Sequence, residues 1–286
     1  MSPDTLPFFV NFDPVALQLG PLAIRWYGLM YLLSFAAFWW LGSVRARQDG
    51  SGWTSEQVND FLFYGALGVI LGGRIGYVLF YDFANVIAEP LRALRIWEGG
   101  MSFHGGMLGV GAAVWWYARR TGRKFFDVTD FIIPMVPIGL ALGRVGNFIG
   151  GELWGRLSDA PWAVIFPNAI MHDGWQSTAL YQQYLTGELN HLTRHPSQLY
   201  QAALEGVLLF IVVWWYSSKP RPRMAVTGLF LIGYGVARLL VEQFRQPDAH
   251  LNFIAFDWLT MGQALSIPMV LAGVVMMVVA YRRQGE

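Results

Sequence analysis

Hydrophobic positions along the chain gather into long runs that are separated by short polar stretches. The runs are close to 20 residues long, the length that a helix needs to cross a hydrocarbon core about 30 Å thick. We predict that each run is helical, because lipid offers no partner to an unpaired backbone polar group. The seven predicted spans lie near residues 22–44, 60–81, 102–118, 128–149, 198–216, 225–244 and 259–281.

Composition supports a membrane protein. Of the 286 residues, 55% are hydrophobic and 14% are charged, whereas a soluble domain carries about 25% charged residues. The predicted fold class is therefore an all-α polytopic membrane protein. The chain has no cysteine, which excludes a disulfide framework, a thiolate metal site and a cysteine nucleophile of its own. The N-terminal segment lacks a basic region followed by an apolar core, so we expect no cleavable signal peptide.

Basic residues between the runs predict the orientation. Eleven of the twenty Lys and Arg residues fall on one side of the predicted membrane, in clusters at 45–47, 119–124, 219–223 and 282–283. The positive-inside rule places that side in the cytoplasm and the N-terminus outside. We therefore treat 1–286 as a single transmembrane domain with a small head, 150–197, inserted on the outer side. No nucleic-acid partner is indicated.

Charged side chains also occur where hydrocarbon is the expected surrounding. An arginine at the centre of a bilayer costs about 2.5–3.5 kcal/mol on insertion scales, so such residues usually face a bundle interior and a partner. One interpretation is that they snorkel to the headgroups or form ion pairs that fix helix register. The other is a positive site for a phosphate or a carboxylate. The arginines concerned are Arg25, Arg74, Arg144 and Arg238.

Polar partners for these arginines lie nearby in the sequence. Glu242 follows Arg238 by four residues, so the two share a helix face. Asn147 follows Arg144 by three, and Glu152 follows it across a Gly-Gly break that we expect to turn the carboxylate back towards the guanidinium. Glu205, in the fifth span, is another candidate partner.

His104 lies in "WEGGMSFHGGMLG", with a glycine pair on each side that allows close approach. A lone membrane histidine can be a hydrogen-bonded packing residue or a proton-transfer group. His191 and His195 have the i, i+4 spacing of metal ligands, but Pro196 disfavours a helix there and no carboxylate completes a set. We predict no metal and no cofactor.

Six segments, in order along nearly the whole chain, resemble one family. They are "GGRIGYVLFY", "WEGGMSFHGG", "GRVGNFIGGELWGR", "RHPSQLYQ", "GLFLIGYGVARLLVEQFRQPD" and "MGQALSIPM". This set resembles the bacterial phosphatidylglycerol–prolipoprotein diacylglyceryl transferases. The resemblance implies seven transmembrane helices around a central cavity with a periplasmic head, in the bacterial cytoplasmic (inner) membrane. It also shows two departures, because the family has Asn where this chain has Gly150 and usually Glu where it has Gln201.

The reaction implied by the resemblance moves the diacylglyceryl group of phosphatidylglycerol to the lipobox cysteine of a prolipoprotein. It forms a thioether and releases glycerol 1-phosphate, the first step of lipoprotein maturation. The predicted partners are thus phosphatidylglycerol, prolipoprotein signal peptides with a lipobox cysteine, and the membrane.

Site roles follow from the resemblance together with the residue chemistry. Guanidinium groups favour the charge that grows on a leaving phosphate, and only the thiolate form of the substrate cysteine is an effective nucleophile. Either a base such as His104 removes the thiol proton, or the arginines lower the thiol pKa while His104 orients the substrate. The predicted catalytic residues are His104, Arg144 and Arg238. The predicted substrate-binding residues are Tyr27, Arg74, Asn147, Glu152, Gly155, Glu242 and Arg245.

Two other classes of protein are consistent with intramembrane charges. An anion transporter or channel also places charged groups in a pathway, but the polar residues here cluster towards the outer side and no paired half-helix repeat is visible. A structural scaffold would use the same ion pairs to fix its assembly. It predicts that loss of a single arginine damages folding before activity.

Overall fold

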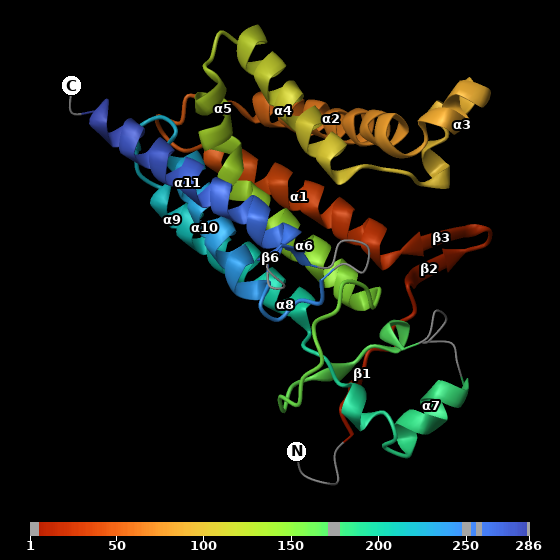
Figure 1. Cartoon of the computed structure of the whole chain (residues 1–286). Coiled ribbons are helices and arrows are strands. Elements are labelled where there is room, and N and C mark those ends of the chain that lie inside the picture. Colours follow the sequence, from red (N-terminus) through yellow and green to blue (C-terminus); the bar gives the residue numbers. More distant parts are fainter. Residues whose placement is uncertain (1–5, 171–177, 248–252, 256–258, 285–286) are drawn as a thin grey trace. The chain divides into compact units, whose positions relative to one another are not determined.

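A computed structural model describes residues 6–170, 178–247, 253–255 and 259–284 (Figure 1). The chain divides into two compact units, one formed by residues 1–37 with 133–286 and the other by residues 38–132. Helix α1 (Trp26–Ala46) begins in the first unit and ends in the second. The prediction of a single domain with an inserted head stays a prediction.

Each predicted span matches a helical stretch in the structure, although residues 22–25 and 259–260, at the predicted starts of two spans, are short strands. The matching elements are α1, α2 (Ser55–Tyr81), α4 (Phe103–Arg120), α5–η3–α6 (Phe125–Ile132, Ile133–Met135, Val136–Ile149), α8–η7–α9 (Ser197–Gln201, Ala202–Leu208, Leu209–Tyr216), α10 (Ala225–Val241) and α11 (Met261–Arg282). Five of these stretches are long and apolar enough to cross a membrane, and α10 is a shorter apolar helix. An all-α polytopic membrane protein is therefore confirmed, whereas the count of seven spans and the central cavity stay predictions.

Large apolar side chains remain exposed along several of these helices. Trp40, Phe63 and Leu271 on α1, α2 and α11 are each more than 60% exposed. Extended exposed apolar surface is unusual for a protein in water. It is what lipid-facing helices present, and it agrees with a multi-pass membrane protein.

In the unit of residues 38–132, glycines bring α2 and α4 into backbone contact. A Cβ atom at Gly72 would lie 2.3 Å from the carbonyl oxygen of Gly105, and one at Gly109 would lie 2.0 Å from that of Gly68. Glycines four residues apart on each helix leave a flat face, which is how membrane helices approach closely without a hydrophobic driving force. This contact fixes the start of α4 against α2.

Local capping sets where these two helices begin. Thr54 and Gln57 form a reciprocal capping box at the start of α2, and Ser102 accepts a hydrogen bond from the Gly105 amide at the start of α4. Between the two helices lie three short elements, namely α3 (Phe83–Ala88), η1 (Pro90–Leu94) and η2 (Ile96–Glu98).

In the other unit, small residues again allow close helix contacts. A Cβ atom at Gly206 of η7 would lie 2.4 Å from the Cβ of Ala141 on α6, and one at Gly273 of α11 would lie 2.6 Å from the carbonyl oxygen of Gly228 on α10. The segment η7 is a π-helix, the wide turn that often marks functional positions. The first contact presses η7 against α6 one turn before Arg144.

Short strands complete this unit. Strand β1 (Phe8–Phe9) pairs in parallel with β4 (Val164–Ile165), so segments far apart in sequence share one core containing Phe9, Ile165, Leu180 and Leu189. The remaining elements are β2 (Val15–Leu19) paired with β3 (Leu22–Arg25), η4 (Pro167–Ala169), α7 (Thr178–Leu185), η6 (Asn190–Leu192) and β5 (Phe253–Ala255) paired with β6 (Leu259–Thr260). The predicted head, 150–197, contains such short elements, although its residues 171–177 lie outside the described residues.

Candidate active site

One buried carboxylate lies between two arginines from different helices. Glu205 of η7 is 1% exposed, with Oε2 3.9 Å from Nε of Arg144 on α6 and Oε1 3.6 Å from Nη1 of Arg238 on α10. These distances are ion-pair contacts and exceed ordinary hydrogen-bond lengths. Neither Glu205 oxygen nor Arg238 Nη1 has a hydrogen-bond partner in the described part of the chain. The cluster therefore holds charge together while leaving hydrogen-bonding capacity unused.

Arg238 is oriented by a second carboxylate. Its Nη2 lies 3.0 Å from Oε2 of Glu242, which comes four residues later on the same helical turn. The hydroxyl of Thr260 donates to Oε1 of Glu242 at 2.8 Å, and Thr260 also caps α11. A Cβ atom at Gly262 would lie 2.8 Å from Glu242. The start of α11 thus fixes Glu242, and Glu242 fixes one side of the Arg238 guanidinium.

The end of α6 arranges the polar groups around Arg144. Nη1 of Arg144 donates to Oδ1 of Asn147 at 3.5 Å, and Asn147 is buried. The helix ends at Gly150, Gly151 takes a left-handed φ of 62°, and the Glu152 amide donates back to the Asn147 carbonyl at 2.9 Å. A glycine at such a position is the common way to end a helix.

The Glu152 side chain turns back towards the end of α6, as predicted, but does not reach ion-pair distance of Arg144. Glu152 is exposed, and within the described residues its carboxylate forms no ion pair with Arg144. The left-handed turn returns the backbone amide of Glu152 to the helix end, and the side chain folds back with it, since a Cβ atom at Gly150 would lie 3.8 Å from the carboxyl carbon of Glu152. Glu205, from a separate helix, is the carboxylate that faces Arg144.

Gly155 and Arg245 form a backbone crossing beneath this helix end. Gly155 is bridged to Arg245, its amide donates to the His195 carbonyl at 3.0 Å, and the Arg156 amide donates to the Phe244 carbonyl at 2.8 Å. A Cβ atom at Gly155 would lie 2.4 Å from the His195 oxygen. Gly155 is therefore required for the close approach of three chain segments.

Tyr27, at the start of α1, packs on α6 next to Asn147. Its ring lies edge-on to Tyr31 with centroids 5.2 Å apart, and a Cβ atom at Gly146 would lie 3.0 Å from the Tyr27 ring. Tyr27 itself is 45% exposed. This places a half-exposed phenol beside the helix turn that carries Asn147.

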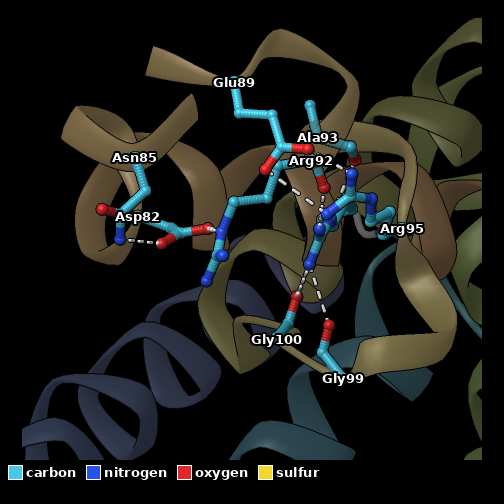
Figure 2. A network of polar contacts seen from close by, with 9 residues as sticks. Asp82, Asn85, Glu89, Arg92, Ala93, Arg95, Gly99 and Gly100 are labelled. Carbon is cyan, nitrogen blue, oxygen red and sulfur yellow. Dashed lines mark hydrogen bonds and ion pairs between the residues drawn. The ribbon is translucent and has the colours of Figure 1, made fainter. Parts of the chain in front are cut away.

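In the unit of residues 38–132, Arg74 of α2 binds backbone carbonyls. Its guanidinium donates to the carbonyls of Arg92 (2.5 Å), Ala93 (2.9 Å), Gly99 (2.8 Å) and Gly100 (3.1 Å). Figure 2 shows Ala93 above this network and Gly99 and Gly100 below it, so the carbonyls approach from opposite directions. Arg74 is 7% exposed, so its donors are used to hold the chain in place.

Side-chain pairs fix the outer part of the same segment. Nε of Arg92 lies 2.7 Å from Oδ2 of Asp82, Asn85 donates to Oδ1 at 2.7 Å, and Arg95 pairs with Glu89 (Figure 2). The hydrogen bonds from Arg92 and Asn85 hold the pKa of Asp82 below its ordinary value. The segment from Asp82 to Gly100 is thus a closely tied loop that leads into α4.

His104 occupies the second position of α4, directly after this loop. Its ring lies edge-on to Phe103 with centroids 5.7 Å apart. The imidazole is exposed and has no hydrogen-bond partner among the described side chains and backbone groups. Both ring nitrogens are therefore open to a substrate.

Comparison with known proteins decides the family. The family model described as "Prolipoprotein diacylglyceryl transferase" matches residues 14–279. The chain belongs to the prolipoprotein diacylglyceryl transferase family. The family prediction made from the six sequence segments is thereby confirmed.

Named relatives share most of their length with this member of the family. The phosphatidylglycerol–prolipoprotein diacylglyceryl transferase of Coxiella burnetii (strain RSA 331 / Henzerling II) is 53% identical over 277 residues, which cover 97% of this chain and 98% of the relative. Its namesake in Ectopseudomonas mendocina is 53% identical over 276 residues (96% and 97%). The one in Psychrobacter arcticus is 54% identical over 279 residues (96% and 95%). The predicted enzyme class, a phosphatidylglycerol-dependent transferase of lipoprotein maturation, is confirmed by this family membership.

The structure brings the predicted site residues into two groups. Arg144, Asn147, Arg238 and Glu242 meet in one unit, and Arg74 and the His104 loop meet in the other. Sequence reasoning named Glu205 only as a partner and passed over Gln198 and Gln201 as site residues, although all three are buried in an apolar helix. The burial of these three side chains could not be read from the sequence.

Within the described residues no three His, Asp or Glu side chains gather as metal ligands.

Proposed function

We propose that this protein transfers the diacylglyceryl group of phosphatidylglycerol to the lipobox cysteine of a prolipoprotein. The thiolate attacks the glyceryl carbon that bears the phosphate, a carbon–sulfur bond forms, and the carbon–oxygen bond breaks. The electron pair stays on the departing oxygen, which leaves as glycerol 1-phosphate. The names of close relatives support this donor and acceptor.

The observation that carries the proposal is the shared carboxylate between Arg144 and Arg238. Their long contacts to Glu205, 3.9 and 3.6 Å, hold two guanidinium groups near one buried point, and Nη1 of Arg238 has no hydrogen-bond partner in the described chain. A guanidinium with unused donors favours a phosphate, whose oxygens it can bind two at a time. Fixed donors stabilise the leaving phosphate most when its charge is greatest, which is the transition state.

Thiol activation has two candidate routes. His104, with both ring nitrogens open, can accept the thiol proton as a general base. Alternatively, the positive field of the arginines lowers the pKa of the substrate thiol, and His104 orients the peptide. The two routes differ in what His104→Gln does, because only the first predicts a steep loss that is relieved at high pH.

The proposed location is the bacterial cytoplasmic (inner) membrane, with the N-terminus on the periplasmic side and the C-terminus in the cytoplasm. Arginines at the ends of α1, α4 and α11 lie on the side assigned to the cytoplasm. The start of α4 with His104 and the end of α6 with Arg144 then lie towards the outer side, where a secreted prolipoprotein presents its cysteine.

The deciding experiment uses purified protein in phosphatidylglycerol vesicles with a lipobox peptide that carries one cysteine. Peptide mass and released glycerol phosphate are followed for the wild type, Arg144→Ala and His104→Gln. Arg47→Ala, an exposed arginine just beyond α1, is the matched control. We expect the wild type and the control to transfer and Arg144→Ala to be inactive although it is inserted and folded.

Either of two results would overturn the proposal. The first is a wild-type protein that is folded but adds no diacylglyceryl mass to a competent peptide; anion flux across the same vesicles would then test the transporter alternative. The second is near-normal turnover by Arg144→Ala, which would remove the arginine pair from the mechanism.

A further inference from the structure

A stripe of buried polar side chains, two glutamines and the carboxylate of Glu205, lies next to the arginine pair. Gln198 and Gln201 are 0% exposed and Glu205 is 1% exposed, although the helix that carries them is otherwise apolar. Their spacing of three and four residues puts them on one helix face. That face is packed against α6 near Ala141, because Gly206 permits the close approach.

These side chains lack the hydrogen bonds that burial normally requires. Gln198 Nε2 donates to the Glu152 carbonyl at 2.6 Å, but its Oε1 has no partner in the described chain. Gln201 has none at either Nε2 or Oε1, and the same holds for both oxygens of Glu205. Buried polar groups are almost always paired, so a group left open deserves a specific explanation.

The open groups have a defined chemistry. An amide offers both a donor and an acceptor, and Glu205 offers acceptors only. A hydroxyl both donates and accepts, so one hydroxyl can join Gln201 to a neighbouring acceptor. A phosphate oxygen can only accept and would leave Oε1 of Gln201 unpaired, whereas a hydroxyl can pair with either Nε2 or Oε1. The stripe is therefore suited to hydroxyl groups carried close to a phosphate.

We propose that Gln201, supported by Gln198, binds the hydroxyl groups of the glycerol headgroup whose phosphate is held by Arg144 and Arg238. The proposal rests on the proposed function, because it names the part of phosphatidylglycerol that lies beyond the phosphate. Gln201 is then a specificity-determining residue that distinguishes a polyol headgroup from other phosphodiesters. It binds the leaving group and takes no part in proton transfer.

The test compares two donor lipids in otherwise identical vesicles. One is phosphatidylglycerol and the other is phosphatidylpropanol, which keeps the phosphodiester but has no headgroup hydroxyl. Gln201→Met keeps the side-chain length and removes both polar atoms. Gln48→Met, at an exposed glutamine beyond α1, is the matched control. Initial rates at several lipid concentrations and the thermal midpoint in detergent are measured for each protein.

We expect the wild type and Gln48→Met to prefer phosphatidylglycerol about tenfold in kcat/KM, the size of one hydrogen bond to a group that is otherwise left open. Gln201→Met should lose this preference through its KM for phosphatidylglycerol. Without lipid its thermal midpoint should be unchanged or higher, since an unpaired buried amide has been removed. A structural hydrogen bond at Gln201, direct or through a trapped water, predicts a lower midpoint instead.

Two outcomes would overturn the inference while leaving the proposed function intact. They are equal use of both lipids by the wild type, and an unchanged preference in Gln201→Met. If the wild type transfers from neither lipid, the proposed function fails. Stabilisation of the wild type by phosphatidylglycerol over phosphatidylpropanol, lost in Gln201→Met, would then still support the headgroup site, and equal stabilisation would refute it.

Discussion

Two buried arginines of this protein use the same side chain in opposite ways. Arg74 places its guanidinium on four backbone carbonyls at 2.5–3.1 Å. Arg238 has one close contact, 3.0 Å to Glu242, a looser one of 3.6 Å to Glu205, and an Nη1 without a hydrogen bond in the described chain. A guanidinium with filled donors holds a fold together, whereas one with open donors can still bind a ligand.

The two arginines also differ in the kind of acceptor that surrounds them. The hydrogen-bond acceptors around Arg74 belong to one loop and are uncharged carbonyls, and the guanidinium also lies over the Tyr77 ring, 5.6 Å from its centroid. The acceptors around Arg238 are carboxylates that hold its charge in place at low exposure. Removal of one partner from a buried ion pair leaves an uncompensated charge, which is strongly unfavourable. The carbonyl contacts of Arg74 fix the conformation of its loop. The carboxylate contacts of Arg238 hold a positive charge that can still bind an anionic ligand.

The sharpest test of this contrast is Arg238→Lys. Lysine keeps the positive charge but loses the planar pair of donors that matches a phosphate. We expect diacylglyceryl transfer to fall by about 10²–10³-fold, the usual cost of removing one fixed donor from a developing oxyanion. The thermal midpoint in detergent should change little, since Glu242 still has a cation beside it. Near-normal turnover would show that Arg238 acts only as a counter-ion.

The matching substitution, Arg74→Lys, should show the reverse pattern. A lysine can satisfy only part of the four carbonyls, and we expect a loss of about 2–4 kcal/mol in stability from the charge-assisted hydrogen bonds. Hydrogen exchange should accelerate over residues 89–102, and transfer per folded molecule should fall far less than in Arg238→Lys. A large drop in kcat with unchanged exchange would instead favour the substrate-binding role predicted for Arg74.

The smallest expected effect concerns His195, which packs against Phe244 and Tyr200 at the backbone crossing. Burial lowers the pKa of His195 below its ordinary value of 6.5. The folded protein therefore binds this proton less readily than the unfolded chain does. The contribution of neutral His195 to the free energy of unfolding is therefore fully present above pH 6.5 and is lost as the pH falls through the folded-state pKa.

His195→Gln removes this titration and should flatten the thermal midpoint between pH 7 and pH 5. The wild type should lose stability over the same interval, by about 1 kcal/mol or less. Identical slopes in the two proteins would assign the acid sensitivity to other groups. Transfer at pH 7 should be affected little, because His195 contacts rings and backbone and lies outside the arginine cluster.

The helices could be predicted from sequence because hydrocarbon imposes both length and periodicity. Glu205 could be named from sequence as a candidate partner, but its position between Arg144 and Arg238 could not be predicted, since it depends on how closely Gly206 lets η7 approach Ala141. The role of Arg74 was hidden for a different reason. Its partners are main-chain carbonyls, which every residue has, so the sequence does not indicate which of them will bind the arginine.

Glycine positions were the most informative local signal and also the most ambiguous. The break at Gly150–Gly151 correctly marked the end of α6. It did not determine whether the Glu152 carboxylate would come within ion-pair distance of Arg144. Gln201 shows a different limit of sequence reasoning. Its departure from the family pattern was visible in the sequence, but it became informative only once the complete burial of its side chain was known.

The parallel pairing of β1 with β4 has a consequence for biogenesis. Phe9 is made roughly 155 residues before its partner Ile165. At about 5–20 residues per second, the N-terminal strand waits about 8–30 s for its partner. During that interval several apolar helices are already inserting, while Phe8 and Phe9 are without their strand. The β1–β4 pair therefore forms only after the segment up to Ile165 has been made, and a chain that stalls before that point leaves Phe8 and Phe9 without their partner strand.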